Sequence, residues 1–376
     1  MKLAALRNLE SKIDRFLDRR NDGKPIVLYG AGFGMPAILA KLERYGFQIA
    51  GICDSDPSKH GTRYEDRYDI FGLEDALAQV PDATFVITAP AHFDDIHRML
   101  MQNVAPGQVS DVDLECAHYF EAHEFEKFFK QNMEGLERVR TSLADDASRD
   151  VFEKVIKAHL SGDRKDFQDA ESETEDWYLF RSLLAPPSNA VYCDCGAYDG
   201  DTIRLFMEAA KGGFERIYAF EPDDAMRGKL EDMARGEPRI QLIAKGAYGS
   251  EGHLSFRPNG VYSMLTSEET SDDVVHVPVT TIDAVLGGQR VDIIKMDIEG
   301  AEYDALKGAE HTIRAHKPKL AICLYHRVDD MLRIPDLVRS FVPEYELHIR
   351  HQSASCTDTI LFAVAPDEGI QNARND

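Results

Sequence analysis

The sequence predicts an α/β protein in which a helical connector joins two mainly parallel sheets. Strand-like apolar runs alternate with helix-like segments over residues 25–112, and the alternation resumes at about residue 190. Such alternation indicates parallel strands joined by crossover helices. The intervening residues are polar and helical in pattern, and a chain of 376 residues is long for one domain. We therefore expect units at 1–112, 113–187 and 188–376.

The composition argues against several classes of partner. The 43 basic and 66 acidic residues give a net charge of −23, which repels nucleic acid and anionic membranes. No run approaches the roughly 20 apolar residues of a membrane span, and the charged N-terminus does not resemble a signal peptide. The six cysteines lack the paired spacing of a metal site. We expect a reduced, cytoplasmic protein, with its oligomeric state left open, a homo-oligomer included.

The N-terminal region opens with one expected amphipathic helix. Its apolar residues recur at helical spacing and are Leu3, Leu6, Leu9, Ile13 and Phe16. In the connector, by contrast, the charged stretch 163–176 is expected to form a loop.

A possible nucleotide pocket follows the first strands of the N-terminal region. Gly30, Gly32 and Gly34 come after the first strand, and Asp54 comes after the second. The third glycine of the dinucleotide pattern would fall at Met35, where a side chain would push the helix away from the strand. A nucleotide or nucleotide-sugar pocket and a purely structural domain are therefore left as equal alternatives.

The C-terminal region predicts five strands joined by crossovers and then an antiparallel hairpin. The expected strands are 191–195, 216–220, 240–247, 291–297 and 319–326, with the hairpin at 345–351 and 359–365. This count and order are those of the Rossmann-like class I methyltransferase fold. A fold alone does not establish an activity.

A glycine loop after the first of these strands suggests a ligand cradle. Asp194, Gly196 and Gly200 have D-x-G-x-x-x-G spacing, and Asp201 and Thr202 then open a helix. Glycine permits a tight turn close to a ligand, and a helix N-terminus offers free N–H donors. The spacing alone would equally fit a tight turn without a ligand.

Two further strand ends favour a ligand that carries a nucleoside. Glu221 ends the second strand, where an acid can accept both hydroxyls of a ribose. The third strand ends at Gly246 and Ala247, which are small enough to lie against an adenine ring.

These motifs resemble the FkbM family of S-adenosylmethionine-dependent methyltransferases. The resemblance covers roughly residues 190–364 and is carried by VYCDCGAYDGDT, IYAFEPDD, VPVTTIDAVL, IIKMDIEGAEYDALKGA, LYHR and CTDTILFAV. It implies a Rossmann-like domain that methylates hydroxyl groups, often on sugars or secondary metabolites. Residues 1–112 resemble the small Rossmann-like domains that precede FkbM domains and also occur in sugar-modifying enzymes.

The resemblance also implies where S-adenosylmethionine binds. Asp194, Gly196, Ala197 and Gly200 fall on the cofactor loop, and Glu221 on the ribose-binding acid. The full cofactor-binding set that we expect is Asp194, Gly196, Ala197, Tyr198, Gly200, Asp201, Thr202, Glu221, Pro222, Gly246, Ala247 and Asp297.

The candidate catalytic residues end the fourth and fifth strands. Methyl transfer needs an oriented acceptor oxygen and a base for its proton. His326 is the preferred base because its unperturbed pKa is near ~6.5. Asp297 could orient His326 or contact the cofactor's amino group, and Glu299 could bind acceptor hydroxyls. For His326, a purely structural role at the strand end is an equal alternative to catalysis. For Glu299, the equal alternative is an acid that faces the positive end of the helix dipole at a helix start.

We expect no metal, because the fifth strand offers His326 without a carboxylate and Mg²⁺ prefers oxygen ligands. Trp177 and Tyr178 could close over the site, although packing of the connector is the simpler role. The leading hypothesis is an S-adenosylmethionine-dependent O-methyltransferase that acts on a small-molecule or glycan acceptor, such as a sugar or a similar polyhydroxyl compound. The alternative is a nucleotide-sugar-binding or NAD-dependent sugar-modifying protein that uses the N-terminal domain.

Overall fold

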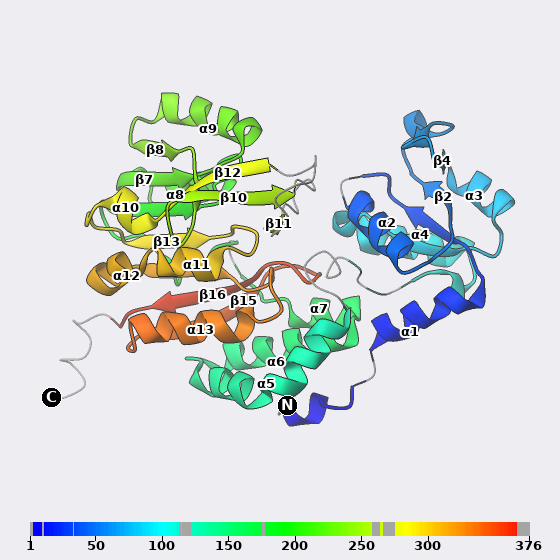
Figure 1. Ribbon diagram of the computed structural model, residues 1–376, viewed down its shortest axis with the longest axis horizontal. Coiled ribbons are helices and arrows are strands. Elements are labelled where there is room, and N and C mark those ends of the chain that lie inside the picture. Colours follow the sequence, from blue (N-terminus) through cyan, green and yellow to red (C-terminus); the bar gives the residue numbers. More distant parts are fainter. Residues whose placement is uncertain are drawn as a thin grey trace.

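The computed structural model describes residues 3–9, 11–32, 34–110, 112, 114, 122–174, 177–257, 264–265 and 275–366. The start of the connector at 113 and 115–121, and part of the segment after the third strand at 258–263, lie outside this range. Figure 1 shows the N-terminal sheet at one end, the larger C-terminal sheet at the other, and helices α5–α7 beside the C-terminal sheet. No helix of the described residues is long and apolar enough to cross a membrane.

The N-terminal sheet has the strand order β3-β4-β2-β1-β5. Its strands are β1 (Ile26–Tyr29), β2 (Ile49–Cys53), β3 (Arg63–Tyr64), β4 (Tyr68–Phe71) and β5 (Thr84–Ile87). Its helices are α2 (Met35–Arg44), α3 (Leu73–Gln79) and α4 (Phe93–Asn103). Strand β1 is buried throughout and pairs in parallel with β2 and β5. Leu28 packs in one core with α2, and Val27 packs in another with α3 and α4, so helices cover both faces.

The expected single N-terminal helix is wrong. The chain forms a short 3₁₀ helix, η1 (Leu3–Leu6), and a separate helix, α1 (Lys12–Asp18). Leu3 and Leu6 pack in the same core as α5 and α6, whereas Ile13 and Phe16 pack in the core of the N-terminal sheet. One apolar pattern therefore serves two cores, and the chain changes direction between them.

The connector consists of α5 (Ala122–Ser142), α6 (Asp146–Ser161) and α7 (Arg164–Ala170). The loop expected at 163–176 is wrong for its first half, which is α7. Asp163 accepts a hydrogen bond from the Lys165 amide and starts the helix, and buried Phe167 anchors it beside Ala158 and Cys356. A cap and a buried aromatic residue therefore contribute to the order of a strongly charged segment, together with the ion pair of Asp166 with Lys157.

The C-terminal sheet has the order β15-β16-β14-β13-β6-β7-β8. Its strands are β6 (Ala190–Cys195), β7 (Phe214–Phe220), β8 (Ile240–Ile243), β13 (Ile293–Met296), β14 (Lys319–Cys323), β15 (Glu346–His351) and β16 (Thr359–Val364). The first five in chain order pair in parallel, and β16 lies antiparallel to both β14 and β15. This arrangement confirms the predicted class I methyltransferase fold with its closing hairpin.

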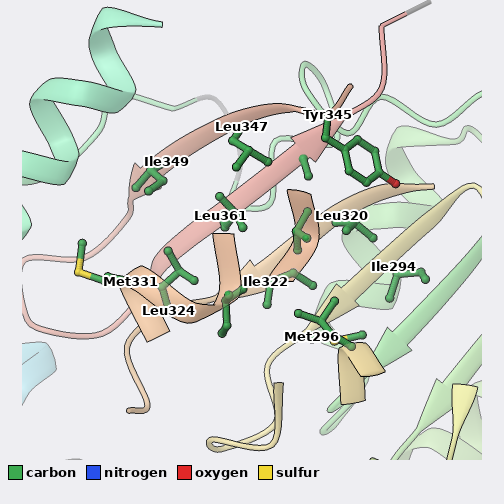
Figure 2. Packing of buried hydrophobic residues seen from close by; sticks show 14 of the residues in the cluster. Ile294, Met296, Leu320, Ile322, Leu324, Met331, Tyr345, Leu347, Ile349 and Leu361 are labelled. Carbon is green, nitrogen blue, oxygen red and sulfur yellow. The ribbon is translucent and has the colours of Figure 1, made fainter. Parts of the chain in front are cut away.

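Helices cover both faces of the C-terminal sheet. They are α8 (Asp201–Ala209), α9 (Asp224–Gly236), α10 (Ile282–Leu286), α11 (Glu302–Lys307), α12 (Glu310–His316) and α13 (Asp330–Phe341). Consecutive residues of β13 enter different cores. Ile294 lies in the core that Figure 2 shows in part, which also contains residues of α11–α13, and Ile293 packs with α8. This two-sided burial holds the strand ends in fixed positions at one edge.

The predicted third strand is shorter than expected. Strand β8 ends at Ile243, and Gly246–Ala247 form β9, which pairs with β12 (Val275–Thr280) in a second sheet. That sheet, ordered β11-β10-β12-β9, also contains β10 (Gly252–Arg257) and β11 (Met264–Leu265).

Candidate active site

The candidate residues gather at the carboxyl edge of the C-terminal sheet. Cys195 pairs with both Phe220 and Met296, so the residues that follow these three strand ends start side by side. They are Gly196 after β6, Glu221 after β7 and Asp297 after β13. Ligands of open α/β sheets bind at this edge.

The glycine loop is built for close approach. Gly196 has φ +79°, and a Cβ there would lie 1.9 Å from the backbone oxygen of Asp297. Gly200 has φ +85°, and a Cβ there would lie 2.4 Å from Met233 Cε. Gly196 has no room for a side chain, and the left-handed backbone at both positions favours glycine. The loop therefore lies directly against the chain that leaves β13, and α8 begins at Asp201 immediately after it.

Glu221 ties this loop to the end of β7. Its Oε2 accepts a hydrogen bond of 2.8 Å from the Tyr198 amide, and its Oε1 accepts one of 2.8 Å from the Asp223 amide. Burial raises the pKa of Glu221, and the two amides partly offset that rise. Each carboxylate oxygen has two lone pairs, so the side chain retains acceptor capacity for ligand hydroxyls.

Four more residues of the expected cofactor-binding set are Tyr198, Pro222, Gly246 and Ala247. A Cβ at Gly246 would be 3.9 Å from Pro222 Cγ, so these two residues are neighbours. Ala247 is buried, whereas the Tyr198 side chain is exposed beside Lys229.

Asp194 and Lys295 form a buried ion pair beneath the loop. Their Oδ1 and Nζ atoms lie 3.2 Å apart. Thr202 donates its hydroxyl proton to Asp194, and Lys295 donates a 2.7 Å hydrogen bond to the Gly196 carbonyl. Burial lowers the Lys295 pKa, but Asp194 and Asp297 outweigh it and raise the pKa above its usual value. We did not predict a role for Lys295 from the sequence. Its position inside the apolar run IIKM was the available sign of a buried, paired lysine.

His326 lies among three carboxylates at the ends of β13 and β14. Its Nε2 is 3.5 Å from Asp297 Oδ1 and 3.6 Å from Glu299 Oε2, and its Nδ1 is 2.8 Å from Glu302 Oε1. His326 is 2% exposed and Glu302 is 0% exposed. The structure therefore brings the three predicted catalytic residues together and adds Glu302. The second acid of the E-G-x-E sequence was the available signal for it. We call Asp297, Glu299, Glu302 and His326 the acidic corner.

The carboxylates determine the protonation of the acidic corner. Burial lowers the His326 pKa, but Glu302, Glu299 and Asp297 outweigh it and raise the pKa to about 10. Burial raises the pKa of Glu299 to about 8, with Asp297 and Glu302 adding to the rise and His326 opposing it. In this arrangement His326 therefore holds a proton at neutral pH. The role of His326 as general base stays a prediction. It requires a bound state in which the His326 pKa is lower than in this arrangement.

Two tyrosines hold Asp297 in place. Tyr325 donates to Oδ1 at 3.1 Å, and Tyr178 donates to Oδ2 at 3.3 Å. Burial raises the Asp297 pKa, but Lys295, His326 and the Tyr325 hydrogen bond together lower it below its usual value. Tyr178 is buried and belongs to the site's support, whereas Trp177 is exposed.

The glycine-rich corner of the N-terminal sheet is largely satisfied by its own residues. Asp54 Oδ2 accepts hydrogen bonds from the Ala31 amide at 2.7 Å and from Lys59 Nζ at 3.0 Å. A Cβ at Gly34 would lie 3.0 Å from the Thr88 carbonyl oxygen, and Met35 is buried in the core. Gly30 has φ +115°, and Gly32 faces open space. A nucleotide ligand here stays a prediction.

The fold and the strand-end loops define a class I methyltransferase. Residues 194–349 match the family model of the methyltransferase FkbM domain. The match supports a methyltransferase that uses S-adenosylmethionine. The resemblance seen in the motifs is confirmed.

Solved structures extend the likeness in fold beyond that domain. The methyltransferase FkbM from Methylobacillus flagellatus KT is similar with a TM-score of 0.71 and 24% identity, over 96% of this chain and 98% of that one. An rRNA methylase from Streptococcus thermophilus has a TM-score of 0.32 and 12% identity, over 48% of this chain and 89% of that one. The similarity to the M. flagellatus protein supports a shared fold that includes the N-terminal sheet. The TM-score of the rRNA methylase is too low to indicate a shared fold. None of the curated proteins matches this chain.

Proposed function

We propose that the protein transfers a methyl group to a hydroxyl of a carbohydrate or a similar polyhydroxyl compound. The observation that carries this proposal is the acidic corner, which lies at the same sheet edge as the glycine loop and Glu221. Carboxylates and a histidine are hydrogen-bonding partners for hydroxyl groups. The net charge of −23 does not favour a nucleic-acid acceptor.

The residues of the glycine loop fit the cofactor. The loop leaves no room for a side chain at Gly196 and has left-handed backbone at Gly196 and Gly200. The α8 N-terminus follows it, and Glu221 retains free lone pairs. We propose that Glu221 binds the ribose, that Gly246 and Ala247 flank the adenine, and that Asp194 holds the loop through Thr202 and Lys295. When bound, S-adenosylmethionine supplies a sulfonium methyl group that is transferred to the acceptor oxygen, with S-adenosylhomocysteine as the second product.

The acidic corner would position the acceptor and handle its proton. Asp297 is held by two tyrosines and therefore presents its oxygens in a fixed direction. Asp297 and Glu299 are the partly exposed members of the corner, so an acceptor hydroxyl would meet these two carboxylates. Orientation of this kind is the chief contribution a protein makes to a displacement reaction.

We further propose that the protein works in the cytoplasm and consists of the three units 1–112, 113–187 and 188–376. The five described cysteines are free and buried, and Cys193 and Cys195 share a hydrogen bond between sulfurs 3.8 Å apart and form no disulfide. This state fits a reducing compartment.

Calorimetric titration with S-adenosylhomocysteine tests the cofactor site. We expect Glu221→Gln to weaken binding by roughly tenfold or more, because hydrogen bonds to a charged group are worth about 1.5–3 kcal/mol. Glu215→Gln is the matched control, since Glu215 is an exposed acid on the same strand. Failure of the wild-type protein to bind would contradict the proposed function, and unchanged binding by Glu221→Gln would refute the ribose assignment.

A further inference from the structure

The acidic corner gathers three carboxylates around one histidine and leaves some of their oxygens without a partner. Three carboxylates surround His326, and the neighbouring Lys295 is already paired with Asp194. Within the described residues, Glu302 Oε2 and Glu299 Oε2 are buried without a hydrogen-bond partner. A buried carboxylate oxygen is costly unless a proton, a donor or a cation satisfies it.

The geometry of the acidic corner suits a cation. Asp297, Glu302 and His326 each offer a ligand atom, and these atoms lie within 4.8 Å of one another. The distances from His326 Nε2 to Asp297 Oδ1 (3.5 Å) and to Glu299 Oε2 (3.6 Å) are too long for ordinary hydrogen bonds. They approach the separation of two ligands that share one cation through bonds of about 2.1 Å. Glu299 Oε2, which lies on the Nε2 side and is buried without a hydrogen-bond partner, is an independent sign that a partner is missing.

We propose that the acidic corner binds one divalent cation through His326 Nε2, Asp297 and Glu299. The cation takes the place of the Nε2 proton, and Glu302, 2.8 Å from Nδ1, accepts the remaining ring proton and orients the histidine. The mixed nitrogen and oxygen ligands favour Mn²⁺ or Zn²⁺ over Ca²⁺ and Mg²⁺, which select oxygen. The sequence alone did not predict this site because the end of the fifth strand offers His326 without a carboxylate.

The cation would give the acidic corner its chemical role. A divalent cation lowers the pKa of a bound hydroxyl, so the acceptor oxygen could lose its proton to solvent without a protein base. This role rests on the proposed function, whereas cation binding itself does not. Protons shared among the carboxylates are the competing way to balance the charge, and they require no metal.

Titration of chelator-treated protein with MnCl₂, followed by calorimetry and by the electron paramagnetic resonance of free Mn²⁺, tests the site. We expect one Mn²⁺ per chain, with affinity reduced at least tenfold in Asp297→Asn and in His326→Gln. Glu310→Gln is the control, because Glu310 is a partly exposed acid on the next helix, paired with Arg314, and it should bind as the wild type does. Thermal melting confirms that each variant is folded.

The absence of Mn²⁺ binding by the wild type, or equal binding by folded Asp297→Asn and His326→Gln, would overturn the cation site. A parallel titration with S-adenosylhomocysteine separates the two proposals. Cofactor binding without Mn²⁺ binding would refute the cation site and leave the proposed function intact. Mn²⁺ binding without cofactor binding would support the cation site and refute the proposed function.

Discussion

At the scale of single residues, Lys295 supports the glycine loop from within the sheet. It is 2% exposed, and its ammonium group contacts both Asp194 and the Gly196 carbonyl. Removal of one partner from a buried ion pair leaves an uncompensated charge, which is far more costly than loss of the pair as a whole.

We predict that Lys295→Met lowers the free energy of unfolding by about 3–5 kcal/mol, because it leaves Asp194 buried without its cation. Urea denaturation measures this change. The double variant Lys295→Met/Asp194→Asn should recover a large part of the loss. A single variant as stable as the wild type would show that the pair is not structurally important.

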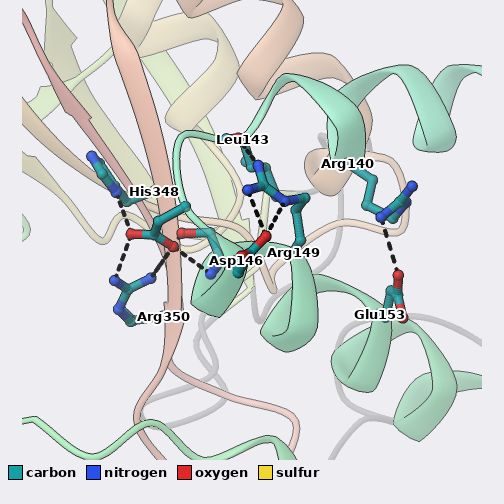
Figure 3. A network of polar contacts seen from close by, with 9 residues as sticks. Arg140, Leu143, Asp146, Arg149, Glu153, His348 and Arg350 are labelled. Atoms are coloured by element: carbon teal, nitrogen blue, oxygen red, sulfur yellow. Dashed lines mark hydrogen bonds and ion pairs between the residues drawn. The ribbon is translucent and has the colours of Figure 1, made fainter. Parts of the chain in front are cut away.

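At the scale of elements, Asp145 joins the connector to the C-terminal sheet. Its Oδ1 accepts a 2.6 Å hydrogen bond from the Ser148 amide and so caps α6. Its Oδ2 binds His348 at 2.7 Å and Arg350 at 2.9 Å, both on β15. Figure 3 shows His348 and Arg350 on β15 beside the start of α6. Burial raises the Asp145 pKa, but Arg350, Ser148 and His348 outweigh it and hold the pKa well below its usual range.

We predict that Asp145→Ala destabilises the protein by about 1–3 kcal/mol, through the lost cap and the lost charged hydrogen bonds. Asp146→Ala is the matched control, since Asp146 is exposed in the first turn of the same helix and pairs only with Arg149 among the described residues. Thermal or urea denaturation should place Asp146→Ala within about 0.5 kcal/mol of the wild type. Equal losses in the two variants would refute a specific role for Asp145.

At the scale of the whole molecule, two buried histidines lie where α6 and α7 meet β15. His159 packs between the rings of Phe125 and Phe167, and His351 contacts Phe167 and lies 2.9 Å from the Thr359 hydroxyl. Burial lowers the His159 pKa to about 3, with His351 adding to the effect. Burial likewise lowers the His351 pKa to about 4.

These histidines should make stability fall in mild acid. Below pH ~6.5 the unfolded chain binds protons that the folded histidines, with lowered pKa values, do not. We predict that each histidine costs roughly 2 kcal/mol of stability between pH 7 and pH 5. Urea denaturation of His159→Phe at both pH values should show a smaller acid loss than the wild type. The same loss of stability between pH 7 and pH 5 in both proteins would show that His159 does not cause it.

The sequence predicted the C-terminal sheet and the place of its site, because periodicity and strand-end motifs act locally. The parallel strands and the meeting of Asp297 with His326 followed from those patterns. Features that depend on packing between distant segments were not predictable. The division of the N-terminal pattern between two cores and the ordering of α7 by Phe167 are examples. Glu302 was missed because its pairing with His326 depends on how α11 packs.

The measurement that tests the central claim most directly is transfer of a labelled methyl group from S-adenosylmethionine to a panel of sugars and other polyhydroxyl compounds. Wild-type protein should place the label on an oxygen of at least one acceptor, as located by NMR of the product. Asp297→Asn should reduce the rate by at least tenfold while it still binds S-adenosylhomocysteine. Transfer only to nitrogen or carbon acceptors, or full activity of Asp297→Asn, would contradict the account.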